Sequence, residues 1–278
     1  MEHRTGHFDG ARGVRIFWQA WLPEGEPRGV VALAHGISEH SGRYAWTGEQ
    51  LVARGYAVYA LDHRGHGQSA GDRAVIDSVA NAVADLGELI AIAEAGSAGQ
   101  DKPFLLGHSF GGFLSLAFAT RRQEEIRGLL LSAPAAVLEA ASPIQRLAGH
   151  VLSAIAPKLG VFTVDPTTVS RDPQVVRDYD ADPLNYHGKL PARTVHEMAQ
   201  EIGRFPQTVP NITVPLLVQV GTGDQLVPPQ SSELVYGWAS SEDKTIKHYD
   251  GLFHEILNEP ERDAVVADTL AWLDAHTN

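Results

Sequence analysis

The sequence contains no cysteine in its 278 residues. A disulfide framework, a thiolate nucleophile and a cysteine-ligated metal are therefore excluded, so covalent catalysis would need another nucleophile. Positive charge is also scarce, because 22 Lys and Arg residues stand against 34 Asp and Glu residues, for a net charge of −12. A chain of this charge repels a phosphate backbone on average, and we expect no nucleic-acid partner.

Long apolar runs are absent as well. No run approaches the 18 apolar residues of a membrane span, and the polar segment Met1–His7 lacks the apolar stretch of a secretory signal. We therefore expect a cytoplasmic protein whose only membrane association would be peripheral. The length and the 44% hydrophobic content suit one elaborated globular unit. They leave open whether it is a monomer or a homodimer.

Short apolar runs predict the core of the fold. Residues 13–22 mix β-branched and aromatic side chains, which predicts an antiparallel strand at a sheet edge. Helix-length stretches, such as 75–94 and 112–122, alternate with later strands, and this order is typical of an α/β fold with a mostly parallel sheet flanked by helices. Five nearly continuous apolar runs predict strands buried on both faces: Val30–His35, Ala57–Asp62, Phe104–His108, Leu129–Ala133 and Leu216–Val220.

One gap interrupts this alternation. About 75 residues separate the predicted strands near Leu131 and Leu217, far more than one crossover needs. We interpret the gap as a helical cap, residues 137–210, inserted into a core formed by residues 1–136 and 211–278. Helices above the carboxyl ends of parallel strands would cover a ligand pocket.

The cap is predicted to contain helices near residues 144–159, 172–180 and 192–204. In the first of these helices the apolar face could pack against the core or contact lipid, and the sequence leaves both possibilities open. Four apolar residues fall at helical spacing on that face: Ile144, Leu147, Val151 and Ile155.

The segment Gly107–Gly111 fits the pattern G-x-S-x-G. It follows one apolar strand and precedes the helical stretch Phe113–Phe118, which is the setting in which this pattern exposes a nucleophilic serine on a tight turn. We therefore predict Ser109 as a nucleophile. A serine hydroxyl needs a neighbouring imidazole to accept its proton, and a carboxylate to orient that imidazole.

The acid and the base should follow the serine in that order. Asp224 lies in a loop directly after a late strand and is the predicted acid, whereas Glu233 is a weaker candidate because it falls within a predicted helix. Three histidines follow. His254 is the predicted base because it lies in a loop between a strand and a helix, while His248 lies in a strand and His276 in the terminal tail, which we expect to be disordered.

Two backbone amides are predicted to form an oxyanion hole. One belongs to Phe110, the residue after the nucleophile, and the other to Ile37, in the loop after an early strand. His63 and His66 form an H-x-x-H pattern, but no third ligand lies nearby, so we interpret the pattern as a hydrogen-bonded turn. We expect neither a metal nor a cofactor.

Five segments contain the distinctive motifs of the chain: His35–Tyr44, Asp62–Ser69, Gly107–Gly112, Gly221–Asp224 and Phe253–Pro260. Together these motifs resemble the monoacylglycerol lipases, the bacterial ones in particular. The resemblance extends through most of the chain, and the motifs at His35–Tyr44 and Asp62–Ser69 are far more specific than G-x-S-x-G.

The resemblance implies an α/β-hydrolase that cleaves monoacylglycerols through the predicted serine, acid and histidine without a cofactor. It also implies a mobile amphipathic cap that touches membranes, and an acyl tunnel that ends near a glycerol pocket. By position, Glu39 and Arg43 would contact substrate at that pocket. The alternative, a salt-bridged loop that only holds the oxyanion strand, stays open.

Two residues depart from the family pattern. Phe110 stands where methionine is usual, and Leu257 stands where mammalian members carry a second histidine, so neither the acyl preference nor the glycerol contacts can be transferred directly. A broader carboxylesterase or lysophospholipase is the nearest alternative function. A cofactor-free haloperoxidase and a non-catalytic receptor on the same fold are more distant ones.

Overall fold

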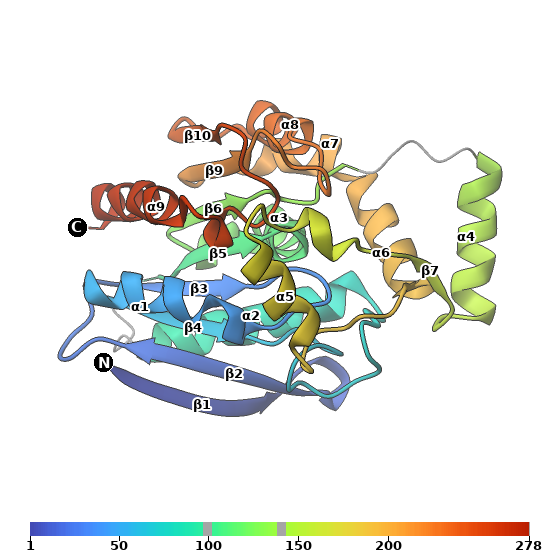
Figure 1. The fold of residues 1–278 in the computed structure, drawn as a ribbon, viewed down its shortest axis with the longest axis horizontal. Helices are drawn as coiled ribbons and strands as arrows, with labels where there is room; N and C mark the ends of the chain where they lie inside the picture. The colour runs from blue at the N-terminus through green and yellow to red at the C-terminus, as the bar shows by residue number, and fades with distance from the viewer. Residues whose placement is uncertain (97–101, 138–142, 278) are drawn as a thin grey trace.

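A computed structural model describes residues 1–96, 102–137 and 143–277. Its centre is an eight-stranded sheet between two layers of helices (Figure 1). The strands are β1 (Glu2–Asp9), β2 (Arg15–Leu22), β3 (Gly29–Ala34), β4 (Tyr56–Leu61), β5 (Phe104–His108), β6 (Gly128–Ser132), β9 (Leu216–Gly221) and β10 (Lys244–Tyr249). Their order in space is β1-β2-β4-β3-β5-β6-β9-β10.

The five predicted buried strands are β4, β3, β5, β6 and β9, which pair in parallel, and the less buried β10 extends the parallel part beyond β9. The predicted strand at residues 13–22 is β2, which pairs antiparallel with β4. Its expected place at the sheet edge is wrong, because β1 pairs with β2 from Glu2↔Leu22 to Asp9↔Arg15 and covers it. The side chains of β1 are mostly exposed, so backbone pairing holds this strand without an apolar pattern that its sequence could reveal.

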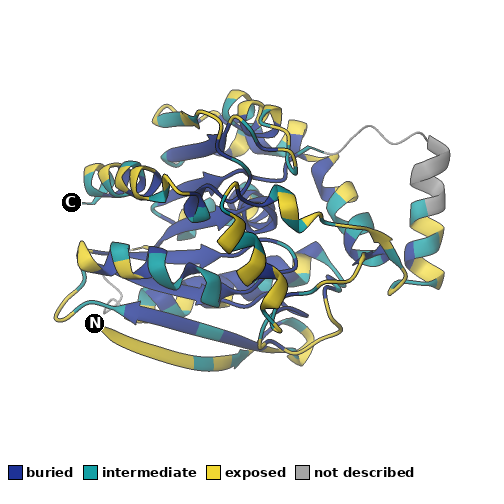
Figure 2. Cartoon of the chain, in the orientation of Figure 1, coloured by how far each residue is buried: buried dark blue, intermediate teal, exposed yellow. Residues whose placement is uncertain are grey.

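Alternate residues of the buried strands face the two helical layers. In β3, Val30 and Ala32 pack in the cluster that includes α2 (Val79–Gly96) and α3 (Phe110–Arg122). Val31 and Leu33 point the other way, into the cluster that includes α1 (Ala45–Ala53) and α9 (Arg262–His276). Because both faces are covered, the strands read as continuous apolar runs, and Figure 2 shows them dark blue throughout.

The segment between β6 and β9 contains the three predicted cap helices. They are α4 (Pro143–Ile155), α5 (Pro173–Ala181) and α6 (Ala192–Ile202), followed by the short α7 (Phe205–Thr208). A small antiparallel pair, β7 (Gly160–Phe162) with β8 (Leu190–Pro191), was not predicted. In the described part of this segment, α4, α5 and the pair of β7 and β8 lie beyond the carboxyl ends of the parallel strands (Figure 1).

Local signals account for part of this segment. Asp172 accepts a hydrogen bond from the backbone amide of Gln174 at 2.8 Å, and Pro173 occupies the first turn of α5, as is typical of a helix start.

Two residues of the predicted apolar face of α4, Val151 and Ile155, are exposed. The side chains of Ile144 and Leu147, like the expected cap residues 138–142, lie outside the described part of the structure.

Candidate active site

Ser109 occupies the turn between β5 and α3. Its backbone angles, φ 52° and ψ −113°, fall in a region that L-residues rarely adopt, so the turn is strained. Hydrogen bonds hold it there: the Ser109 amide donates to the carbonyl of Ser132 at 2.9 Å, and its carbonyl accepts from the amide of Phe113 at 2.9 Å. The surrounding structure therefore enforces a conformation that the residue alone would avoid.

The two glycines of the motif make this turn possible by their lack of a side chain. A Cβ atom on Gly107 would lie 2.5 Å from the carbonyl oxygen of Gly111. A Cβ on Gly111 would lie only 2.0 Å from the carbonyl oxygen of Ala34, at the end of β3. The spacing G-x-S-x-G therefore follows from close backbone packing between β3, β5 and the start of α3.

Asp224 and His254 meet above the carboxyl ends of the strands. The Nδ1 atom of His254 lies 2.7 Å from Oδ2 of Asp224, while Oδ1 accepts hydrogen bonds from the amides of Leu226 and Val227, both at 2.9 Å. Because the carboxylate accepts, Nδ1 carries the proton. The Nε2 atom of His254 is buried and has no hydrogen-bond partner within the described residues, which leaves its lone pair available.

The loops that carry these two residues touch through their backbones. A Cβ atom on Gly221 would lie 2.2 Å from the carbonyl oxygen of Leu252, and one on Gly223 would lie 2.8 Å from that of Gly251. The amide of Gly223 donates to the carbonyl of Leu252 at 2.9 Å. The glycines of the motif Gly221–Asp224 therefore let the acid approach the histidine.

Two small cavities meet at Ser109. The first, of about 20 Å³, is lined by polar and apolar groups that include Ile37, Glu39, His108, Ser109, Tyr179, His254 and Glu255. The second, of about 110 Å³, is largely apolar, and its lining includes Ile37, Ser109, Phe110, Phe162, Leu190 and Met198. Ser109 thus lies between a space suited to a small polar group and a space suited to a hydrocarbon chain.

The loop after β3 brings its amides to the same place. The Gly36 amide donates to Oε1 of Glu39 at 2.6 Å and is therefore occupied. Within the described residues, the amides of Ile37 and Phe110 donate no hydrogen bond, although both residues line the cavity beside Ser109. These are the two amides predicted for an oxyanion hole.

Glu39 and Arg43 belong to a buried ion-pair network. Arg43 donates to Oε2 of Glu39 at 2.6 Å and, through two nitrogens, to both carboxylate oxygens of Glu255 at 2.7 Å each. Burial alone would raise the pKa of Glu255, but the charge and hydrogen bonds of Arg43 outweigh it and lower the pKa to about 2. The sequence analysis missed Glu255, for which adjacency to His254 was the only available signal.

Four histidines around the loop after β3 are buried and neutral. Burial lowers the pKa of His63 to about 3, of His66 to about 4 and of His108 to about 3, and it places the pKa of His35 well below its ordinary value. The amide of His63 donates to Nε2 of His35 at 2.9 Å, so the proton of His35 lies on Nδ1, which contacts the carbonyl of Gly36 at 2.7 Å. These rings form part of the packing beneath the loop.

The rival candidates lie elsewhere. Glu233, in α8 (Gln230–Trp238), pairs with His248 of β10, and both side chains are substantially exposed. The expectation of a disordered His276 is wrong. Its Nδ1 lies 2.6 Å from the carbonyl of Trp272, its Nε2 lies 2.9 Å from Asp243, and its ring stacks on the indole of Trp272. A packed final helix thus orders the tail.

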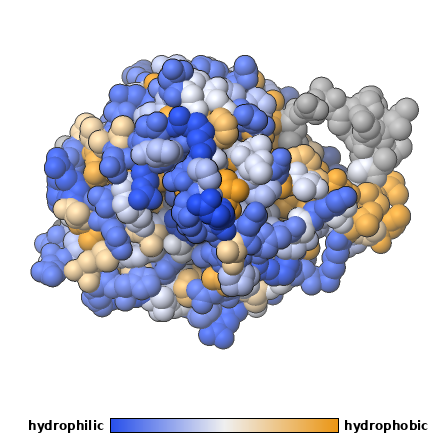
Figure 3. Space-filling view, in the orientation of Figure 1, coloured by the Kyte–Doolittle hydropathy of each residue, from blue (hydrophilic) through white to orange (hydrophobic). Residues whose placement is uncertain are grey.

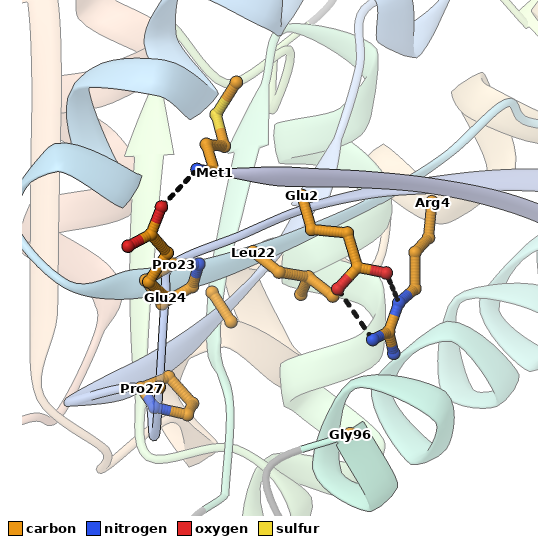
Figure 4. Close-up of a pocket in the computed structure, with 10 residues that line it drawn as sticks. Met1, Glu2, Arg4, Leu22, Pro23, Glu24, Pro27 and Gly96 are labelled. Atoms are coloured by element: carbon orange, nitrogen blue, oxygen red, sulfur yellow. Dashed lines mark hydrogen bonds and ion pairs between the residues drawn. The ribbon is translucent and has the colours of Figure 1, made fainter.

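A larger cavity of about 490 Å³ lies at the antiparallel edge of the sheet (Figure 4). Its lining includes Glu2, which pairs with Arg4 at 2.6 Å, and Met1, whose amino group lies 3.6 Å from Glu24. None of the ten residues that line it is a predicted site residue. This cavity is therefore not a candidate catalytic site, although it is larger than the two cavities beside Ser109.

Comparisons with known proteins agree with this fold. The family described as "Serine aminopeptidase, S33" matches residues 25–261. Monoacylglycerol lipase of Mycolicibacterium smegmatis is 41% identical over 98% of this chain and 98% of its own length, and human monoglyceride lipase is 32% identical over 98% and 90%. The crystal structure of Paleococcus ferrophilus monoacylglycerol lipase superposes with a TM-score of 0.82 at 33% identity, covering 99% of this chain and 100% of that one.

A strained serine turn on a mostly parallel sheet, in a chain whose fold matches that of a solved monoacylglycerol lipase, defines a serine hydrolase of the α/β-hydrolase fold, and the predicted fold class is confirmed. Within that class the chain belongs to the monoacylglycerol lipase family, as its motifs predicted. It is a carboxylic ester hydrolase.

Proposed function

We propose that the protein hydrolyses monoacylglycerols to fatty acid and glycerol through an acyl-enzyme on Ser109. One observation carries the proposal: His254, held by Asp224 at 2.7 Å, leaves its buried Nε2 unpartnered within the described residues, in a cavity that Ser109 also lines. An imidazole in this tautomer can accept the proton of a serine hydroxyl.

In the first step, Oγ of Ser109 attacks the ester carbonyl carbon while Nε2 of His254 takes the hydroxyl proton. The tetrahedral intermediate collapses, the bond to the glycerol oxygen breaks, and the imidazolium returns its proton to that oxygen. A water molecule then attacks the acyl carbonyl carbon while His254 accepts a proton from it; the bond between the acyl carbon and Oγ of Ser109 breaks, the imidazolium returns its proton to Oγ, and fatty acid leaves. Asp224 stabilises the imidazolium in both steps without accepting the proton.

The amides of Ile37 and Phe110 would donate to the oxygen that becomes negative in each tetrahedral intermediate. Their support is that they border Ser109 and are not used elsewhere in the described structure. Loss of one such donor typically costs about 2.7–4 kcal/mol of transition-state stabilisation. The two donors would therefore supply a large part of the rate enhancement.

The two cavities suggest how a monoacylglycerol would lie. Its acyl chain would enter the apolar cavity of about 110 Å³, and its glycerol would lie beside Glu39 and His254, where the cavity of about 20 Å³ would have to widen to hold it. Phe162 of β7 and Met198 of α6 contribute to the apolar wall, so we propose that residues 137–210 act as a cap. The Mycolicibacterium and human relatives are named for this activity, as a monoacylglycerol lipase and a monoglyceride lipase.

The outer surface of this cap suggests how a lipid substrate would arrive. Apolar side chains gather on the rim formed by α4 and β7, orange at the right of Figure 3, and include Val151, Ile155, Leu159, Val161 and Phe162. No helix in the described segments combines the length and the apolar content that crossing a bilayer requires. We propose that this rim makes transient contact with a lipid surface.

The test measures fatty-acid release from monoacylglycerols of graded chain length, from p-nitrophenyl esters, from a lysophospholipid and from a diacylglycerol. We expect the highest kcat/KM on monoacylglycerols. Ser109→Ala should lower kcat by about 10⁴–10⁶-fold, because no other nucleophile takes its place.

Other outcomes would redirect the proposal. Ser109-dependent turnover that favours short synthetic esters or lysophospholipids would make the protein a broader carboxylesterase or a lysophospholipase. Activity of Ser109→Ala within tenfold of the parent would remove Ser109 as the nucleophile.

A further inference from the structure

A single guanidinium joins two loops that flank the candidate active site. Arg43 donates to Glu39, four residues earlier in the chain, and to Glu255, 212 residues later. The exposed fractions of the three side chains are 10% for Arg43, 3% for Glu39 and 6% for Glu255. Water is therefore largely excluded from these ion pairs, and each contact is correspondingly strong.

Glu39 connects this guanidinium to the loop that carries the Ile37 amide. Its Oε1 atom accepts hydrogen bonds from the Gly36 amide at 2.6 Å and from the Tyr44 hydroxyl at 2.7 Å. Gly36 immediately precedes Ile37, and a Cβ atom on Gly36 would lie only 3.4 Å from Cβ of Ser109. The position of Glu39 therefore helps to determine where the Ile37 amide points relative to Ser109.

Glu255 connects the same guanidinium to the loop that carries the histidine. It directly follows His254, and its carboxylate accepts a further hydrogen bond from the side chain of Asn258 at 3.0 Å. Its backbone amide donates to the carbonyl of Val169 at 2.7 Å. With its side chain and its backbone both held, Glu255 restrains the orientation of His254.

The cavity of about 20 Å³ beside Ser109 suggests an alternative role, in which Arg43 binds the glycerol of the substrate. Glu39 and Glu255 line that cavity, but each has at least one carboxylate oxygen bonded to Arg43. The guanidinium itself lies 4.9 Å from the centre of the Tyr179 ring, a cation–π contact with α5. These contacts engage Arg43 with protein groups rather than with the space beside Ser109.

We propose that Arg43, with Glu39 and Glu255, is a positioning residue that fixes the oxyanion loop relative to His254. The inference rests on the proposed roles of Ser109, His254 and the Ile37 amide. Because the oxyanion forms in both acylation and deacylation, a misplaced amide slows both steps whatever alcohol leaves. A residue that binds glycerol would instead affect only substrates that contain glycerol.

The experiment compares Arg43→Met with the parent on two esters of the same acyl chain, a monoacylglycerol and a p-nitrophenyl ester. We expect kcat to fall by about 10²-fold on both, with the two losses agreeing within about threefold, and KM to change by less than about threefold. Arg43→Lys should recover only part of the loss, because one ammonium cannot reproduce the two-pronged contact with Glu255.

Arg121→Met is the matched control. Arg121 donates at 2.5 Å to the buried Glu201, in a contact between α3 and α6, so its loss also removes an arginine from a buried carboxylate. The Arg121→Met protein should have a lower thermal midpoint than the parent, while its kcat should stay within about threefold of the parental value. If Arg43→Met does not fold, Glu255→Gln keeps the side-chain volume and should lower kcat by about tenfold on both esters.

Two results would overturn the inference. A loss confined to the monoacylglycerol, or a raised KM for it alone, would make Arg43 a substrate-binding residue. Parental kcat on both esters in a folded Arg43→Met protein would leave Arg43 a purely structural role. Either result requires an active, Ser109-dependent parent. A parent without Ser109-dependent activity would instead refute the proposed function.

Discussion

At the scale of single residues, this site depends on glycines, which have no side chain, as much as on the side chains that carry the chemistry. Gly111 allows the serine turn to approach β3, and Gly221 allows the acid loop to approach the histidine loop. In both places a Cβ atom would meet a backbone carbonyl at 2.0–2.2 Å, and backbone atoms cannot move aside as a flexible side chain can. The glycines are therefore part of the candidate machinery.

Gly221→Ala tests this argument. The new methyl group would push against the carbonyl of Leu252 and separate Asp224 from His254, so we expect kcat to fall by about 10²-fold and the thermal midpoint to decrease. Kinetics on a p-nitrophenyl ester and a melting curve measure both effects.

Gly237→Ala, in α8, is the matched control, because a Cβ atom there meets no heavy atom within 4 Å. Alanine in place of a helical glycine should leave kcat unchanged and stabilise the protein by about 0.5–1 kcal/mol. Equal kinetics for the two alanine variants would show that the contact between the loops is not needed for activity.

At the scale of elements, the insertion divides into two parts with different contacts. The part around α5 is bound to the loop after β3: the amide of Tyr186 donates to the carbonyl of Ser38 at 2.8 Å, and His40 lies 2.9 Å from Asp182. The part formed by α4 and β7 instead presents apolar side chains to solvent (Figures 2 and 3). The part around α5 is therefore suited to cover the candidate site without moving, and the part formed by α4 and β7 is suited to contact lipid.

Ile155→Glu tests the lipid-facing surface. Ile155 is 76% exposed, so a charge there costs little in folding but opposes entry into a lipid interface. We expect turnover of a long-chain monoacylglycerol in vesicles to fall by about tenfold, while turnover of dissolved p-nitrophenyl butyrate stays within twofold. Vesicle co-sedimentation should weaken in parallel.

Gln200→Glu, at an exposed position of α6, a helix that contributes none of the apolar side chains of this rim, adds the same charge and should change turnover of neither substrate. If Ile155→Glu and Gln200→Glu behave alike on vesicles, the rim formed by α4 and β7 makes no specific lipid contact.

At the scale of the whole molecule, buried neutral histidines couple stability to pH. Burial holds the pKa of His63, His66 and His108 at about 3 to 4, and that of His35 well below its ordinary value. In the unfolded chain these groups titrate near pH 6.5. Below that pH the unfolded chain binds protons that the folded chain rejects, so acid favours unfolding.

We therefore expect the free energy of unfolding to fall steeply between pH 6.5 and pH 5. Each of the four histidines contributes up to about 1.4 kcal/mol per pH unit, which amounts to several kcal/mol over this range. Urea unfolding curves at pH 7, 6 and 5 measure the change.

His66→Phe provides the control for this pH dependence. It removes one titrating ring that stacks on Phe110 and should make the dependence shallower. A free energy of unfolding that stays constant from pH 7 to pH 5 would contradict the burial of these neutral rings.

Much of the fold was predictable from the sequence because its signals are local. The five apolar runs predicted the buried strands, and the helices near residues 172–180 and 192–204 lie close to their predicted positions. The edge strand β1 was not predictable, because its exposed side chains carry no apolar alternation. The order of His276 was also missed, because it depends on the neighbouring Trp272 and on Asp243 from another part of the chain.

The sequence by itself determined the fold class, the family and the short motifs around Ser109, Asp224 and His254, because a tight turn needs its glycines and its nucleophile at fixed spacing. Only the tertiary structure decided that Arg43 pairs with Glu255, 212 residues away, and that this pair links the loop after β3 to the loop that carries His254. Spacing along the chain cannot encode such a contact. It arises when separate strands end at the same edge of the sheet and the loops there exclude water from opposite charges.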